Sequence, residues 1–179
     1  KQRASARVYP ARVPLTHPLA AVNGAFNAVV VEAEAAGRLM FYGQGAGGAP
    51  TASAVMGDVV MAARNRVQGG RGPRESKYAK LKIAPIGFIP TRYYVNMDVA
   101  DRPGVLSAVA AEFSKREVSI AEVRQEGMIG DDGHPCGARI VVVTHSATDA
   151  ALSETVEALA DLGVVQTINS VLRMEGTDV

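Results

Sequence analysis

The sequence is poor in the residues that form covalent or metal-bound cross-links. Its 179 residues include one cysteine, Cys136, and three histidines scattered along the chain. A single cysteine excludes an internal disulfide and suits a reducing compartment, so a cytoplasmic protein is expected. The spacing of cysteine and histidine matches no zinc-binding motif, and no metal site is predicted.

The sequence also lacks an excess of either charge and any long apolar run. Lys and Arg number 19 against 18 Asp and Glu, which gives a formal net charge of +1. This balance provides no field that would hold nucleic acid or an anionic membrane. No stretch of about 18 apolar residues could span a membrane, and no signal-peptide pattern opens the chain. Small soluble molecules are therefore the expected partners.

The first part of the chain predicts a few strands and one helix. Residues 3–13 alternate as a strand, without a cap or initiator Met before them, which favours a position inside a larger protein. Residues 17–22 predict a short helical turn, and residues 27–33 and 38–42 an antiparallel hairpin. Residues 51–66 predict an amphipathic helix with one apolar face, formed by Ala54, Val55, Val59, Ala62 and Ala63.

Residues 68–90 are rich in glycine and proline, and this composition is typical of an interdomain linker. Lys77, Lys80 and Lys82 form a basic stretch within it. Such a stretch is usually a solvated surface, although a phosphate-binding patch is the alternative.

The second part, residues 91–177, predicts the order β-α-β-β-α-β. Strands are expected at 93–99, 118–125, 138–145 and 164–174. One helix starts at Pro103, and a second follows the capping-box pair Ser146 and Asp149 and ends at Gly163. Two helices on one face of a four-stranded antiparallel sheet form a ferredoxin-like arrangement. The fold class predicted for the whole chain is α+β.

A glycine-rich loop, YGQGAGG, lies between the predicted hairpin and helix. Gly43, Gly45 and Gly48 satisfy the GxGxxG pattern of dinucleotide-binding loops. The second strand and its acidic residue, expected about 20 residues later, are absent, and so is the GK[ST] of a P-loop. Two alternatives remain: glycines needed for a tight turn, or a loop whose backbone at Gly47 and Gly48 contacts a cofactor held elsewhere, with Thr51 capping the helix.

The segments HPLAAVNGAFNAVVV and YGQGAGGAPTASAVMGDVV, followed by a βαββαβ pattern with the turn DRPGVL, closely resemble the C-terminal part of bacterial homoserine dehydrogenases. The resemblance implies that residues 1–67 end a substrate domain whose catalytic lysine and NAD(P)-binding Rossmann domain lie upstream. No catalytic residue is then expected in this chain, which alone would be inactive. Gly47, flanked by Gly45 and Gly48, would face the cofactor. His17 would either approach the active site or have a structural role.

The βαββαβ segment resembles an ACT domain, a module that binds amino acids and regulates the attached enzyme. The resemblance implies effector contacts from Asp101, Gly104 and Ser119, threonine as effector, and a homodimer or homotetramer formed through this domain. On the residues alone, Asp101 is equally well explained as a helix N-cap. The intact enzyme would interconvert homoserine and aspartate semialdehyde. The rival interpretations are a stand-alone amino-acid-binding regulator and an ACT-bearing kinase or hydroxyacid dehydrogenase.

Overall fold

The computed structural model describes residues 3–70 and 80–175. The chain divides into two compact units, one formed by Lys1–Arg12 with Leu81–Val179 and the other by Val13–Lys80. We call the first the βαββαβ unit and the second the hairpin–helix unit. The domain boundaries expected from the sequence, 1–67, 68–90 and 91–177, stay predictions. Residues 71–79 of the predicted linker, Lys77 included, lie outside the described residues, whereas Lys80 and Lys82 are exposed.

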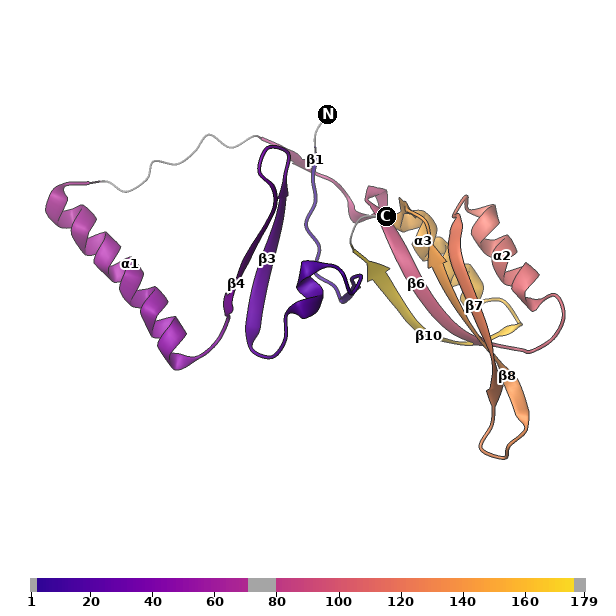
Figure 1. Ribbon diagram of the computed structural model, residues 1–179. Helices are drawn as coiled ribbons and strands as arrows, with labels where there is room; N and C mark the ends of the chain where they lie inside the picture. The colour runs from indigo at the N-terminus through magenta and orange to yellow at the C-terminus, as the bar shows by residue number, and fades with distance from the viewer. Residues whose placement is uncertain (1–2, 71–79, 176–179) are drawn as a thin grey trace. The chain divides into compact units, whose positions relative to one another are not determined.

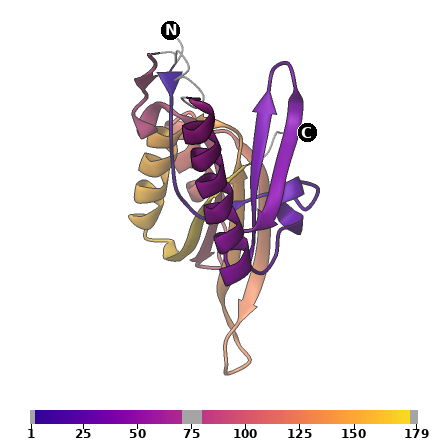
Figure 2. The same cartoon turned by 90° about the vertical axis from the view of Figure 1, so that its left-hand side faces the viewer.

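The hairpin–helix unit begins with the 3-10 helix η1, Pro18–Ala21. Strands β3, Phe26–Ala33, and β4, Gly37–Gln44, then pair antiparallel along their full lengths, as Figure 2 shows. The rings of Phe26 and Tyr42 stack across the pair with centroids 4.9 Å apart. Helix α1, Gly48–Gln68, follows and ends where Gly69 adopts a left-handed conformation, a common helix terminator. A hairpin and a helix lie where they were predicted, but α1 begins three residues before the predicted residue 51 and ends two after residue 66.

The βαββαβ unit has the predicted element order. It consists of β6, Pro90–Val99; α2, Val105–Lys115; β7, Ile120–Ile129; β8, Pro135–Thr144; α3, Asp149–Ala160; and β10, Val165–Met174. The four strands form an antiparallel sheet in the order β10-β6-β8-β7, and α2 and α3 cover one of its faces (Figure 1). The α+β class and the ferredoxin-like arrangement are confirmed.

Short elements extend this unit. Strand β2, Ala11–Arg12, adds to the edge of the sheet parallel to β10, and β1, Arg3–Ala4, pairs with β5, Lys82–Ile83. The 3-10 helix η2, Ile86–Phe88, precedes β6, and β9, Ala147–Thr148, pairs with the start of β6. The single strand predicted for residues 3–13 is therefore two short strands, which pair with different partners, β5 and β10.

The core lies between the sheet and its two helices. Strand β6 alternates, so that its core-facing side chains, Tyr93, Val95, Met97 and Val99, are at most 4% exposed. They meet apolar side chains from both helices at helical spacing: Val105, Val109, Phe113, Leu152 and Leu159. This periodicity is visible in the sequence, which explains why the unit was predictable.

Both ends of α3 differ from the prediction. The N-cap is Thr148, whose Oγ1 accepts a hydrogen bond from the Ala151 N–H at 3.3 Å, and not Ser146. Asp149 is the first residue of the helix and is buried. The helix ends at Ala160 with Asp161 as its C-cap, before Gly163. Among the described residues, no helix is both long and apolar enough to cross a membrane.

Candidate functional site

The glycine loop is short because β4 continues to Gln44 and α1 already begins at Gly48. Gly45 donates its N–H to the Ala25 carbonyl at 3.1 Å, and a Cβ at this position would collide with the Asn27 side chain. Gly47 is the N-cap of α1 with φ of 133°, a conformation that strains any L side chain. The turn therefore accounts for glycine at position 47, whereas at position 45 an added Cβ would require the end of the Asn27 side chain to move.

Gly48 differs from its two neighbours. A Cβ built there would meet no other atom of residues 3–70 and 80–175 within 4 Å, so none of these residues requires glycine at this position. Thr51 lies inside the first turn of α1, where its N–H bonds to the Gly47 carbonyl at 3.1 Å. The prediction that Thr51 caps the helix is wrong, because the helix starts three residues earlier than its sequence pattern indicates.

The start of α1 is suited to an anionic ligand. The first amides of a helix have no acceptor within it, and the helix dipole adds partial positive charge there. The first turn contains no acidic residue that would compete for these amides. An open concavity of about 700 Å³ lies against this end of the helix, lined by Gly45, Ala46, Gly47, Gly48, Thr51, Ala52, Val55 and Met56. The loop thus offers a contact surface with few polar groups of its own.

The turn between β6 and α2 contains two of the predicted effector residues. Gly104 is the N-cap of α2 with φ of 90°, and a Cβ there would face open space. Asp101 lies three residues earlier, is exposed, and makes no hydrogen bond or ion pair through its side chain with any residue of the described ranges. The alternative explanation of Asp101 as an N-cap is therefore wrong. Its carboxylate is available to a ligand.

Ser119 lies at the other end of α2. It precedes β7, where its carbonyl accepts a hydrogen bond from the His145 N–H at 2.8 Å. A concavity of about 330 Å³ adjoins it, lined by Ala110, Phe113, Ser114, Glu117, Val118, Ser119 and Ile120. Eleven helical residues at 1.5 Å each separate the two ends of α2 by about 16 Å. One chain therefore does not bring Ser119 together with Asp101 and Gly104 around a ligand as small as an amino acid.

His17 has a structural role. It is the N-cap of η1, and its Nδ1 accepts a hydrogen bond from the Leu19 N–H at 3.2 Å. The prediction that it approaches an active site remains a prediction.

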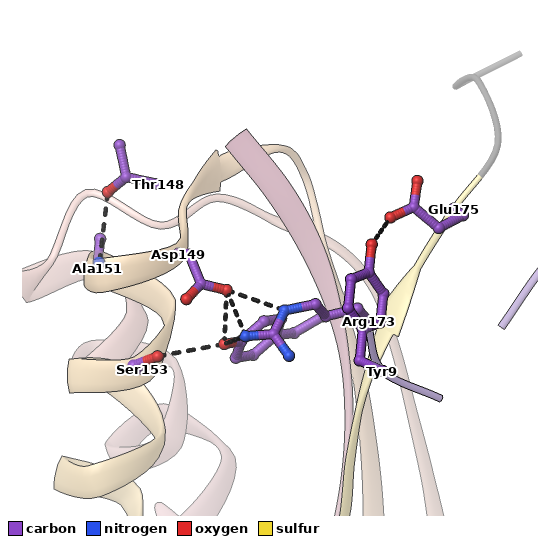
Figure 3. Close-up of polar contacts among 8 residues, drawn as sticks. Tyr9, Thr148, Asp149, Ala151, Ser153, Arg173 and Glu175 are labelled. Carbon is purple, nitrogen blue, oxygen red and sulfur yellow. Dashed lines mark hydrogen bonds and ion pairs between the residues drawn. The ribbon is translucent and has the colours of Figure 1, made fainter. Parts of the chain in front are cut away.

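A buried polar cluster, which the sequence reasoning missed, joins α3 to two strands (Figure 3). Arg173 of β10 donates from Nε and Nη2 to Asp149 Oδ1, at 3.0 and 2.7 Å. The Tyr93 hydroxyl donates to the same Oδ1 at 3.2 Å and lies 3.2 Å from Ser153 Oγ. Burial raises the pKa of the Tyr93 hydroxyl above its ordinary value, against the opposing effect of the Ser153 hydrogen bond. The hydroxyl is therefore a neutral donor at physiological pH.

The N-terminal segment contacts this cluster from outside. The Tyr9 ring lies 5.0 Å from the Arg173 guanidinium carbon and 5.3 Å from that of Arg7. The Tyr9 hydroxyl donates to the Glu175 carboxylate (Figure 3). A sequence signal was Arg173, the one charged residue of strand β10, but its partners are 24 and 80 residues away.

Comparisons with known proteins cover nearly all of the chain. Residues 2–60 match the family model described as homoserine dehydrogenase, and residues 93–164 match that of the ACT domain. Homoserine dehydrogenases from Mycobacterium tuberculosis and Corynebacterium glutamicum are 81% and 58% identical over 98% of the chain. A solved homoserine dehydrogenase structure from Thiobacillus denitrificans covers 96% of the chain, with a TM-score of 0.82 and 28% identity. The chain spans about 40% of the length of each relative: 40%, 38% and 39%.

Proposed function

Because the chain belongs to the homoserine dehydrogenase family, we propose that it is the C-terminal, regulatory part of an enzyme that interconverts L-homoserine and L-aspartate 4-semialdehyde with NAD(P). The observation that carries the proposal is the 81% identity over 176 residues to a homoserine dehydrogenase, in a chain that also matches the ACT family. The catalytic lysine and the nucleotide-binding domain belong to residues upstream of those in this chain, which alone is inactive.

The glycine loop is the part of this chain that would contact the dinucleotide. When bound, the dinucleotide would exchange a hydride with the substrate. The residues fit this role in part. A side chain at position 48 would meet none of the described residues, so a ligand is the reason left for glycine there, and the amides at the start of α1 favour an anion. The loop offers too few polar groups to hold a dinucleotide alone. Its proposed contribution is to bring backbone close to a cofactor bound mainly by upstream residues.

The βαββαβ unit is proposed to sense an amino acid, with L-threonine as the effector. The Asp101 carboxylate would pair with the ammonium group, and the amides at the start of α2 would bind the carboxylate. Gly104 leaves open space for the ligand. Because Ser119 lies at the far end of α2, it would reach the same ligand only from a second copy of the chain. This geometry supports a homo-oligomer whose effector site lies between two ACT domains.

The test substitutes Asp101 in the intact enzyme. Asp101→Ala removes a charged hydrogen bond worth roughly 1.5 to 3 kcal/mol, so the concentration of threonine giving half-maximal inhibition should rise about tenfold or more. The melting temperature should hardly change, because Asp101 caps no helix. Uninhibited turnover should also stay near normal.

The control is Asp131→Ala, which removes another exposed carboxylate, in the turn between β7 and β8. This variant should keep the wild-type response to threonine. An unchanged dose response in Asp101→Ala would reject the assignment of Asp101. Failure of threonine to inhibit the wild-type enzyme would reject threonine as the effector.

A further inference from the structure

The hairpin–helix unit is joined to the βαββαβ unit by two stretches of chain, one leaving at Arg12 and one returning at Leu81. A ligand bound to the βαββαβ unit can act on the hairpin–helix unit along the chain only through one of these two stretches. The residues of the βαββαβ unit that hold these two stretches are therefore the place to look for a coupling element.

The outgoing stretch is held by the last strand. Ala11 pairs with Arg173, and the Glu175 N–H donates to the Arg12 carbonyl at 2.9 Å. Tyr9 adds its ring against the Arg173 guanidinium and its hydroxyl bond to Glu175 (Figure 3). Tyr9 is only half-buried, and it does not belong to the apolar core.

The returning stretch is held by the start of α3. The Asp149 N–H donates to the Ile89 carbonyl at 3.1 Å, and Pro90 pairs with Thr148. The Tyr93 hydroxyl, a few residues further along the same stretch, donates to the Asp149 carboxylate at 3.2 Å. Asp149 therefore contacts this stretch through both its backbone and its side chain.

One ion pair joins the two attachments. Arg173 and Asp149 lie 2.7 Å apart, with side chains 26% and 8% exposed. A hydrogen-bonded ion pair screened from water depends steeply on its geometry, because separation leaves a buried charge without a partner. Movement of α3 relative to β10 would alter this pair, and Tyr9 rests directly on its arginine.

We propose that Tyr9, Arg173 and Asp149 form a coupling cluster through which an amino acid bound to the ACT domain acts on the stretch of chain leading into the hairpin–helix unit. The inference rests on the proposed function, since it requires that the ACT domain bind an effector. It adds the residues that transmit the signal, which are distinct from those proposed to bind the ligand. Tyr9 acts as a positioning residue, without contact to effector or substrate.

The test compares Tyr9→Ala with Val8→Ala, a control at the neighbouring, fully exposed side chain. Threonine binding to the 179-residue chain is measured by calorimetry, and inhibition by threonine is measured in the intact enzyme. Tyr9→Ala should change the dissociation constant of the chain less than twofold, yet reduce the maximal inhibition of the enzyme at least threefold. Val8→Ala should match wild type in both assays. Tyr9→Phe keeps the ring but loses the hydrogen bond to Glu175. This variant should remain folded, and its maximal inhibition by threonine should lie between those of Tyr9→Ala and Val8→Ala.

Each outcome has one meaning. If the wild-type chain does not bind threonine, the proposed function fails for this effector. If wild type binds and is inhibited, but Tyr9→Ala and Tyr9→Phe are inhibited as fully as Val8→Ala, the coupling cluster is rejected. It is also rejected if the Tyr9 variants lose threonine binding in parallel with inhibition, because Tyr9 would then serve folding or binding. Hydrogen exchange gives an independent readout, since threonine should slow exchange of the Glu175 amide at least threefold in wild type and not in Tyr9→Ala.

Discussion

The two units of this chain differ in where their apolar side chains lie. The βαββαβ unit buries a contiguous set of them between one sheet and two helices. In the hairpin–helix unit, none of the described residues, 13–70 and 80, is buried. The first unit therefore encodes its own core, whereas the second has apolar surface without the residues that would cover it.

Helices α1 and α2 show the same contrast. Helix α2 buries Val105, Val109 and Phe113 against the sheet. Helix α1 has no buried residue, and its large apolar side chains are 43–87% exposed: Val55, Met56, Val59, Val60, Met61 and Val67. The apolar face predicted for α1 is thus exposed in this chain. A helix pattern indicates which side will be covered, but it does not identify the covering surface.

The largest effect is expected when the units are separated. A peptide of residues 13–80 should be largely unfolded in water, because a two-stranded hairpin and a lone helix are at best marginally stable. Residues 81–179 should fold cooperatively around their core. Circular dichroism during thermal melting of both peptides measures this difference. A sharp cooperative transition in the 13–80 peptide would show that the unit is self-sufficient and would break the comparison.

A matched pair of phenylalanines sharpens the comparison within the whole chain. Phe113→Ala should lower the free energy of unfolding by about 3 to 5 kcal/mol, because this side chain is 1% exposed and its loss leaves a cavity. Phe41→Ala, at a side chain 63% exposed in β4, should change it by no more than about 0.5 kcal/mol. Denaturant titration of the chain measures both. Equal losses would mean that Phe41 packs in solution against a surface absent from this fold.

Two substitutions in the glycine loop separate the effect of backbone strain on stability from the effect of a lost contact on cofactor binding. Gly47→Val should destabilise the start of α1 by about 1 to 3 kcal/mol, because φ of 133° strains a branched residue. A loss of cofactor affinity in Gly47→Val could therefore come from this strain as well as from a lost contact. Gly48→Ala should leave stability nearly unchanged, since a Cβ meets nothing there.

In the intact enzyme, Gly48→Ala should raise the KM for NAD(P) several-fold if backbone contacts the dinucleotide. Steady-state kinetics and a melting curve on the same variant decide the matter. A folded Gly48→Ala enzyme with wild-type cofactor affinity would reject the proposed contact between Gly48 and the dinucleotide.

The smallest expected effect is a pH dependence in the βαββαβ unit. The Arg139 guanidinium, which donates from Nε to Asp98 Oδ1 at 2.9 Å, lowers the pKa of Asp98 below its ordinary value of 3.8. As the pH falls, Asp98 is therefore protonated in the unfolded chain before it is protonated in the folded chain. The stabilisation is complete above the unfolded pKa and is lost as the pH falls through the lower, folded pKa. For a partly exposed pair it amounts to roughly 0.2 to 1 kcal/mol. Asp98→Asn should abolish this part of the acid dependence in denaturant titrations, while a slope equal to wild type would mean that the pair contributes nothing.

Some local details differed from the sequence reasoning for identifiable physical reasons. Asp101 has the residue type of an N-cap, but the left-handed Gly104 moves the start of α2 three residues onward. Ser146 and Asp149 satisfy a capping-box pattern, but Thr148 provides the cap, and the Asp149 carboxylate turns to Arg173. At α2 the left-handed glycine sets the helix start, and at α3 the extended backbone of Thr148 makes it the cap in place of Ser146.

The elements and the family resemblance could be predicted from the linear sequence, because strand alternation, helical periodicity and the order of the glycine and DRPGVL motifs are local properties. The exposure of Asp101, the position of Ser119 at the opposite end of α2, and the cluster of Tyr9, Asp149 and Arg173 depend on how distant parts of the chain fold together. Those contacts join residues as many as 164 positions apart, from Tyr9 to Arg173. They exist because β2 adds to the edge strand β10 and because α3 packs on the sheet beside it.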